Sequence, residues 1–218
     1  MTVARTDLVH RGLWLNWLTI GYNAVEAIVS IAAGMVAGSV ALIGFGVDSV
    51  IELTASGAAQ WRLRIDDDVA RRERVERLSL QIIGGCFLAL AVYVAFESLE
   101  TLLARDAPDG SVVGVVILSL SVVVMPVLAR AKRRVAGALQ SRALTADATQ
   151  TSLCAYLSVI ALAGVGLNTV IGWWWADPVA ALAMVPIIAK EGVQGIRGES
   201  DCAACPHDLA PVERDAGA

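Results

Sequence analysis

Long apolar segments alternate along the chain with short segments that hold most of the charged residues. Six of the apolar segments are long enough to cross the hydrocarbon core of a bilayer as helices, which takes about 20 residues. They cover residues 13–33, 39–61, 78–103, 112–129, 143–167 and 173–189. The sequence therefore predicts an all-α, polytopic membrane protein with six transmembrane helices.

The composition agrees with this architecture, since 56% of the 218 residues are hydrophobic and only 17% are charged. Charged residues lead directly into the first apolar segment, and no small-residue cleavage site follows it, so a membrane span is predicted and not a signal peptide. An integral, multi-pass protein follows, in the plasma (inner) membrane if the source is bacterial. The four cysteines are too scattered for a disulfide framework, and nothing indicates nucleic-acid binding.

The basic residues predict the orientation. Of the 17 lysines and arginines, all except Arg105 lie before the first span, in the links 62–77 and 130–142, or after the sixth span. Six spans place these four segments on one side, and the positive-inside rule makes that side, with both termini, cytoplasmic. Residues 1–197 are thus predicted to form the transmembrane transport domain. Residues 198–218 form a cytoplasmic tail that is too short for its own core and is expected to be disordered.

Two acidic residues stand inside the second predicted span. Asp48 and Glu52 are four residues apart, so they share one helix face. Each charge near the middle of a bilayer costs about 2.5–3.5 kcal/mol on insertion scales. No lysine or arginine is expected deep in any span, so the predicted partner is a cation from outside the chain. The alternative is a pair of buried acids that bind neighbouring helices through hydrogen bonds.

The fifth span contains polar residues that could face this pair. Asp147, Gln150 and Cys154 have the spacing i, i+3 and i+7 and are predicted to form one stripe. Because the second and fifth spans run in opposite directions, Cys154 is expected level with Asp48. Gln150 is expected level with Glu52, and Asp147 nearer the cytoplasm. Carboxylates with a thiolate suit a borderline-soft divalent ion such as Zn²⁺, although Gln150 could instead orient a ligand and Cys154 could be a small buried hydrophobic residue.

Two further acids have weaker predictions. Glu26 faces inward on the first span, where it either lines an ion path or has a structural, hydrogen-bonded role. Asp177 precedes Pro178 at the start of the sixth span, and an aspartate before a proline is a good N-cap for its own helix.

The tail has a possible second metal site. Cys202, Cys205 and His207 could bind an ion together with Asp201 or Asp208, which gives only three strong ligands before an acid or a second subunit contributes. The alternative is a solvated tail with incidental thiols.

Several short motifs together resemble one family. The second span carries Gly-Ser-x-Ala-Leu at 38–42, followed by Asp48 and Glu52. The fifth span carries Ala-Leu-x-Ala-Asp at 143–147, and the sixth begins with Trp-x-Asp-Pro at 175–178. In these features the chain resembles a shortened member of the cation diffusion facilitator (cation efflux) family, without the usual cytoplasmic C-terminal domain.

The resemblance implies six spans, a homodimer, and export of Zn²⁺ and related ions against protons. One departure bears on the ion, because the histidine and aspartate of the family's fifth span fall on Gln150 and Cys154 in this chain. A second concerns the missing cytoplasmic domain, whose metal capture the Cys/His tail could replace.

The sequence therefore predicts a secondary active transporter and not an enzyme, with no catalytic residues and no cofactor. The expected substrate is a divalent metal, with Zn²⁺ favoured over Cd²⁺, Co²⁺ and Fe²⁺, exchanged for protons by alternating access in the lipid bilayer. Asp48, Glu52 and Cys154 are the expected direct ligands. Gln150 is expected to bind the metal or orient a ligand, and Asp147 to lie on the cytoplasmic approach to the metal site. Two alternatives are a non-transporting metal sensor or binder that acts through the tail, and a membrane thiol oxidoreductase.

Overall fold

The computed structural model describes residues 2–62, 69–139 and 142–197, and these residues form six helices and no strand. The helices are α1 (Thr2–Ala37), α2 (Val40–Arg62), α3 (Val69–Ala104), α4 (Val112–Leu139), α5 (Arg142–Ile171) and α6 (Ala176–Arg197). Each contains a stretch that is long and apolar enough to cross a membrane. The prediction of an all-α protein with six transmembrane helices is confirmed.

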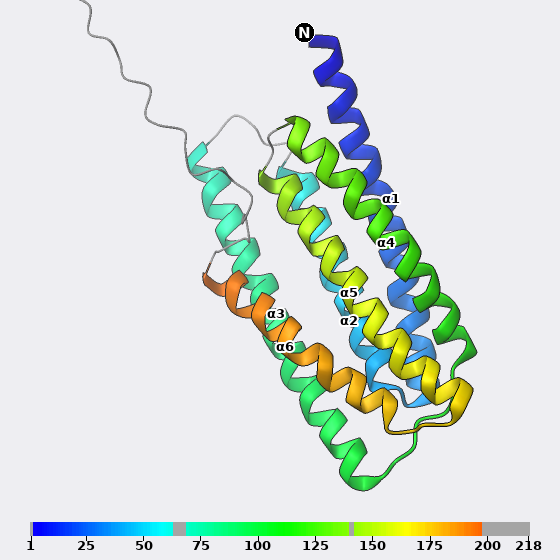
Figure 1. Ribbon diagram of the computed structural model, residues 1–218. Coiled ribbons are helices and arrows are strands. Elements are labelled where there is room, and N and C mark those ends of the chain that lie inside the picture. The colour runs from blue at the N-terminus through cyan, green and yellow to red at the C-terminus, as the bar shows by residue number, and fades with distance from the viewer. Residues whose placement is uncertain (1, 63–68, 140–141, 198–218) are drawn as a thin grey trace, which may run out of the picture.

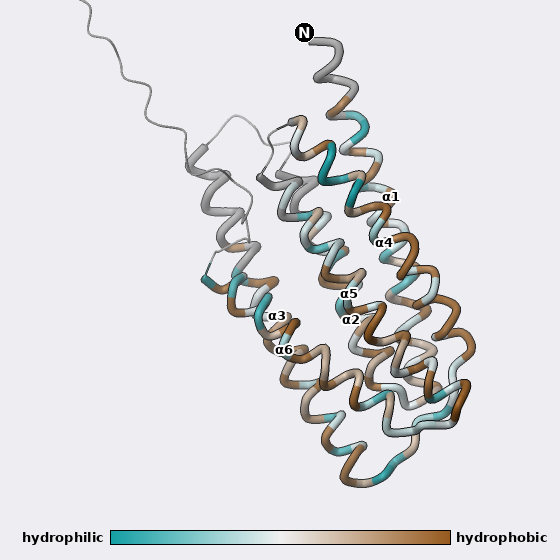
Figure 2. Tube along the Cα trace, in the orientation of Figure 1, coloured by the Kyte–Doolittle hydropathy of each residue, from teal (hydrophilic) through white to brown (hydrophobic). Residues whose placement is uncertain are grey.

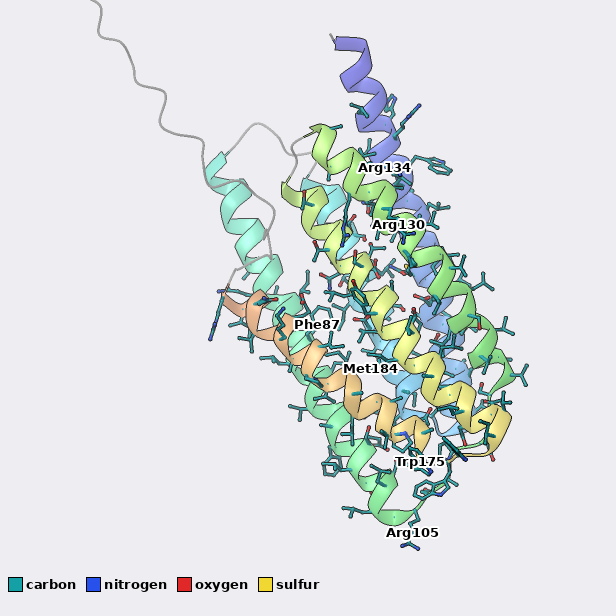
Figure 3. The ribbon with its side chains drawn as sticks, viewed as in Figure 1. Phe87, Arg105, Arg130, Arg134, Trp175 and Met184 are labelled. Atoms are coloured by element: carbon teal, nitrogen blue, oxygen red, sulfur yellow. The ribbon has the colours of Figure 1, made fainter. Side chains whose placement is uncertain are left out.

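Helix α2 occupies the middle of the bundle. It packs against α1, α3, α5 and α6, while α4 contacts α1 and α5 on one side and α3 pairs with α6 on the other (Figure 1). Phe87 of α3 and Met184 of α6 are buried in the apolar core near the meeting of these two helices (Figure 3). Large apolar side chains on the outer faces, such as Ile28, Val92 and Val123, are exposed, as contact with lipid requires. Side chains on α2 are therefore the best shielded from lipid.

The ends of the bundle agree with the predicted orientation. Arg130 and Arg134 lie toward the end at which α1 begins, whereas Arg105 and Trp175 lie at the opposite end (Figure 3). The rings of Trp173 and Trp175 stack with centroids 5.3 Å apart, as expected of aromatic side chains at a membrane interface. Figure 2 shows hydrophilic positions on α4 near the basic end.

Several helices extend beyond their predicted edges. Helix α4 continues to Leu139, so most of the segment 130–142 is helix and not a link, and α3 begins at Val69. Arginine, lysine and alanine favour helix, so backbone hydrogen bonding continues where the apolar pattern stops. The extension of α4 is important because it fixes which way the basic residues after Ala129 point.

A tight turn joins α1 to α2 at the end of the bundle opposite to the start of α1. Gly38 has φ +67°, which an L side chain rarely adopts. The amide of Ser39 then donates to the carbonyl oxygen of Gly34 at 3.0 Å, as in a Schellman C-cap. This turn sets where α2 starts and hence the depth of its polar residues.

Asp177 caps a different helix from the one predicted. Its buried carboxylate accepts hydrogen bonds from the Ser39 hydroxyl and, at 3.4 Å, from the amide of Ala41. The Ser39 oxygen in turn accepts a bond from the Leu42 amide at 3.1 Å. The interpretation as an N-cap of its own helix was wrong, because the unpaired first amides of α2 lie at the same end of the bundle and attract a carboxylate. The interaction ties α6 to the start of α2.

Candidate metal centre

The acids of α2 lie inside the bundle. Asp48 is 4% exposed and Glu52 is 0% exposed, and both fall within the membrane-length stretch Val40–Gly57. The serines at 49 and 56 are buried with them, so α2 presents a polar stripe to its neighbours. The prediction that this pair lies in the protein interior is confirmed.

The facing stripe of α5 differs in one member from the prediction. Asp147, Thr151 and Cys154 are buried, whereas Gln150 is partly exposed. At 100° per residue, Gln150 lies about 60° from Asp147 around the helix, at the edge of the stripe. Its neighbour Thr151 points inward instead.

Helix α1 also turns a polar face inward. Its buried polar side chains recur every three or four residues, which is the period of one helix face: Asn16, Thr19, Asn23, Glu26 and Ser30. Both amide atoms of Asn23 are buried without a hydrogen-bond partner in the part of the chain that the structure describes. Three helices thus direct polar groups to one interior region.

Glu26 connects this region to α5. Its side chain is 0% exposed and accepts hydrogen bonds from the hydroxyls of Ser49, at 2.8 Å, and Ser121. The Cys154 sulfur lies 3.8 Å from Glu26 Oε2. Glu26 therefore joins α1, α2, α4 and α5 at the level of the thiol. The prediction that it faces inward is confirmed, and its hydrogen bonds agree with the structural role that was one of its two predicted alternatives.

The carboxylate of Glu52 can still accept hydrogen bonds or bind an ion. Neither of its carboxylate oxygens accepts a hydrogen bond of normal geometry from the described residues, although Thr151 and Cys154 face it. The Cys154 thiol also interacts with Asp48. The positive charge of Lys132 on α4 also acts on Glu52. A carboxylate buried without well-formed hydrogen bonds is nevertheless costly, and a bound cation would lower that cost.

A buried lysine contradicts one expectation from the sequence. Lys132 of α4 is fully buried, with its Nζ 2.7 Å from Asp147 Oδ2 and 3.1 Å from Thr151 Oγ1. Asp147 also accepts a hydrogen bond from the Ser56 hydroxyl at 2.8 Å. The expectation that no lysine or arginine lies deep in a span was wrong, because α4 continues past Ala129 and Lys132 falls on its inner face. Asp147 is thus neutralised from within the chain.

Replacing Lys132 with methionine is expected to destabilise the protein by about 3–5 kcal/mol, because it leaves the buried Asp147 carboxylate without its counter-charge. Thermal unfolding of the purified protein in detergent measures this. Arg133→Met is the matched control, since Arg133 is exposed and donates a hydrogen bond to Ser152 at the surface, and it should shift the midpoint far less. Equal shifts in the two variants would contradict the structural role of the pair.

The buried polar side chains of α1, α2 and α5 are not arranged to bind a metal ion in this structure. Among the described residues, no three His, Cys, Asp or Glu side chains form a group that could hold an ion as they stand. An ion would have to draw the side chains of α1, α2 and α5 together. The tail residues Cys202, Cys205 and His207, on which the sensor and thiol oxidoreductase alternatives depend, lie outside the described residues.

Comparison with known proteins adds independent findings. Residues 17–198 match the family model described as the cation efflux transmembrane domain. Transmembrane protein 163 of Xenopus laevis is 29% identical over 139 residues, which are 63% of this chain and 48% of that protein. An uncharacterized transporter of Synechocystis, sll1263, is 27% identical over 177 residues, 77% and 56% of the two chains. Magnetosome protein MamB of Paramagnetospirillum magneticum is 26% identical over 167 residues, 74% and 56% of the two. The chain spans about half the length of these relatives.

Proposed function

We propose, because the chain belongs to the cation efflux family, that it exports divalent metal ions from the cytoplasm, with Zn²⁺ favoured and Cd²⁺, Co²⁺ and Fe²⁺ as further substrates. Export is coupled to protons and carried out by a homodimer. One observation carries the proposal: Asp48 and Glu52 are buried within a membrane span beside Cys154. A related protein whose name describes it as a transporter supports it.

Charge balance favours a cation as the substrate. The interior region toward which α1, α2 and α5 direct polar groups contains four buried carboxyl groups, those of Glu26, Asp48, Glu52 and Asp147. Lys132 is the one cationic side chain that is buried among the described residues. This lysine pairs with Asp147, which leaves the acids around Cys154 without a full counter-charge. Buried charges are tolerated when they are paired or coordinate a metal. A divalent ion supplies the missing positive charge.

The ligand types favour a borderline-soft metal. A thiolate from Cys154 together with carboxylates from Asp48 and Glu52 suits Zn²⁺ and also accepts Cd²⁺, Co²⁺ and Fe²⁺. Mn²⁺ prefers a set of oxygen ligands, so a sulfur ligand disfavours it.

Proton coupling follows from the same ligands. Carboxylates and thiols bind metal only when deprotonated, so protons compete with the ion and metal affinity falls as the pH falls. A site near the middle of the membrane that opens alternately to each side would load metal from the cytoplasm and release it outside as protons bind.

Transport by the purified full chain in proteoliposomes tests the proposal. Zn²⁺ entry, followed with a metal indicator inside the vesicles, is expected to be accompanied by proton movement in the opposite direction. A pH gradient that drives protons out of the vesicles should increase the initial rate of Zn²⁺ entry. Mn²⁺ should be transported more slowly than Zn²⁺. Absence of flux with all of Zn²⁺, Cd²⁺, Co²⁺, Fe²⁺ and Mn²⁺ would refute transport. A metal flux that does not change with the pH gradient would refute proton antiport.

A further inference from the structure

The site needs one more ligand than α2 and α5 supply. Those helices contribute Asp48, Glu52 and Cys154, while the side chain of Gln150 is partly exposed at the edge of the stripe. Zn²⁺ in proteins is most often four-coordinate. The fourth group must therefore come from another helix or from solvent.

Glu26 of α1 stands at the required place. Tetrahedral coordination with a Zn–S distance of about 2.3 Å and a Zn–O distance of about 2.1 Å places the two donor atoms about 3.6 Å apart. The distance between Cys154 Sγ and Glu26 Oε2 is 3.8 Å. These two atoms could bind one ion with almost no movement relative to each other.

The surroundings of Glu26 resemble those of a positioned ligand. Hydroxyl groups of Ser49 and Ser121 donate to its carboxylate from two other helices, and Tyr22 contacts Ser121 at 2.9 Å. Hydrogen bonds of this kind orient ligating carboxylates. A carboxylate has about four lone-pair sites, so these bonds leave capacity for an ion. Neither oxygen of Glu52, in the same interior region, accepts a hydrogen bond of normal geometry from the described residues.

We propose that Glu26 is the fourth metal ligand, which makes the site one of three carboxylates and one thiolate shared by α1, α2 and α5. The inference rests on the proposed function and names a ligand that neither α2 nor α5 provides. It replaces Gln150 as a direct ligand. It also means that α1 must follow the ion whenever the site changes its access.

Glu26→Gln tests the assignment, because it keeps the size of the side chain and one of the two oxygens that accept the serine hydrogen bonds but removes the charge. Calorimetric titration of the full chain with Zn²⁺ is expected to show an affinity loss on the order of 100-fold, at the upper end of what changes around metal ligands cause. Glu100→Gln removes the same charge from an exposed position on α3 and should leave the affinity unchanged. Gln150→Ala should lose less affinity than Glu26→Gln.

Co²⁺ as a probe separates the possible outcomes. In Glu26→Gln the thiolate-to-cobalt charge-transfer absorption should persist while the visible bands change, because one oxygen ligand is lost and the sulfur stays. Unchanged affinity and an unchanged spectrum in Glu26→Gln, with binding lost in Asp48→Ala, would overturn the role of Glu26 and leave the proposed function standing. If neither variant affects binding, the proposed function itself fails.

If Glu26→Gln does not fold, Glu26→Asp replaces it. The shorter carboxylate should weaken binding and alter the cobalt bands, and wild-type behaviour would overturn the proposal.

Discussion

Asp48→Ala is expected to abolish metal-driven proton movement in proteoliposomes. The substitution removes one of the charged ligands of the proposed site, at a buried position within a membrane span where no other acid replaces the lost carboxylate. Proton movement should disappear together with metal flux, because the same carboxylate binds both. A pH indicator and a metal indicator inside the same vesicles measure the two fluxes at once.

Two controls make this result specific. Asp48→Asn keeps the shape of the side chain, so it should lose transport while thermal unfolding in the absence of metal stays close to that of the wild type. Asp106→Ala changes an exposed acid in the turn between α3 and α4 and should transport normally. Flux that persists in both Asp48 variants would remove Asp48 from the site and the main support for the proposed function.

The number and type of helices could be predicted from the sequence, whereas their ends could not. Hydropathy detects the part of a helix that contacts lipid, and that signal stops at about Ala129 in α4. Helix α4 nevertheless continues to Leu139, because the residues that follow favour helix without being apolar. A prediction that treats this segment as a link assigns Lys132 no direction, whereas the helix fixes it on the inner face.

The phase of the helix would have located Lys132. The buried residues of α4 recur at Leu118, Ser121, Met125 and Leu128, and four residues further along the same face is Lys132. Continuing the apolar stripe through the basic segment therefore places a lysine in the interior. Only the packing of α4 on α5 then shows that its partner is Asp147.

The candidate site was predictable where chemistry alone identifies a residue. Asp48 and Glu52 stand out as acids within an apolar span, and Cys154 as a thiol on the helix that packs against them. Whether Glu26 and Gln150 face the site depends on the direction in which each side chain points from its helix axis. Spacing along the sequence gives that direction only approximately. A difference of about 60° around a helix separates a buried stripe from its edge, and Gln150 falls on the edge.

Cys154→Asp is expected to change which metal is preferred while leaving a charged site in place. It replaces the soft thiolate with a hard carboxylate, so Cd²⁺ should bind less well and Mn²⁺ better. The ratio of Cd²⁺ to Mn²⁺ transport should fall by about tenfold or more, the size of effect that changes around metal ligands produce. Competition between the two ions in one proteoliposome preparation measures this ratio directly.

A second cysteine provides the matched control for this substitution. Cys86 lies on α3 and is exposed, whereas Cys154 is buried, so Cys86→Ser should leave the metal ratio unchanged. Cys154→Ser should lower Cd²⁺ transport without the gain in Mn²⁺, because a neutral hydroxyl does not replace the lost charge. An unchanged ratio in Cys154→Asp would mean that the sulfur packs beside the ion without binding it, and the acids of α1 and α2 would then determine the choice of metal.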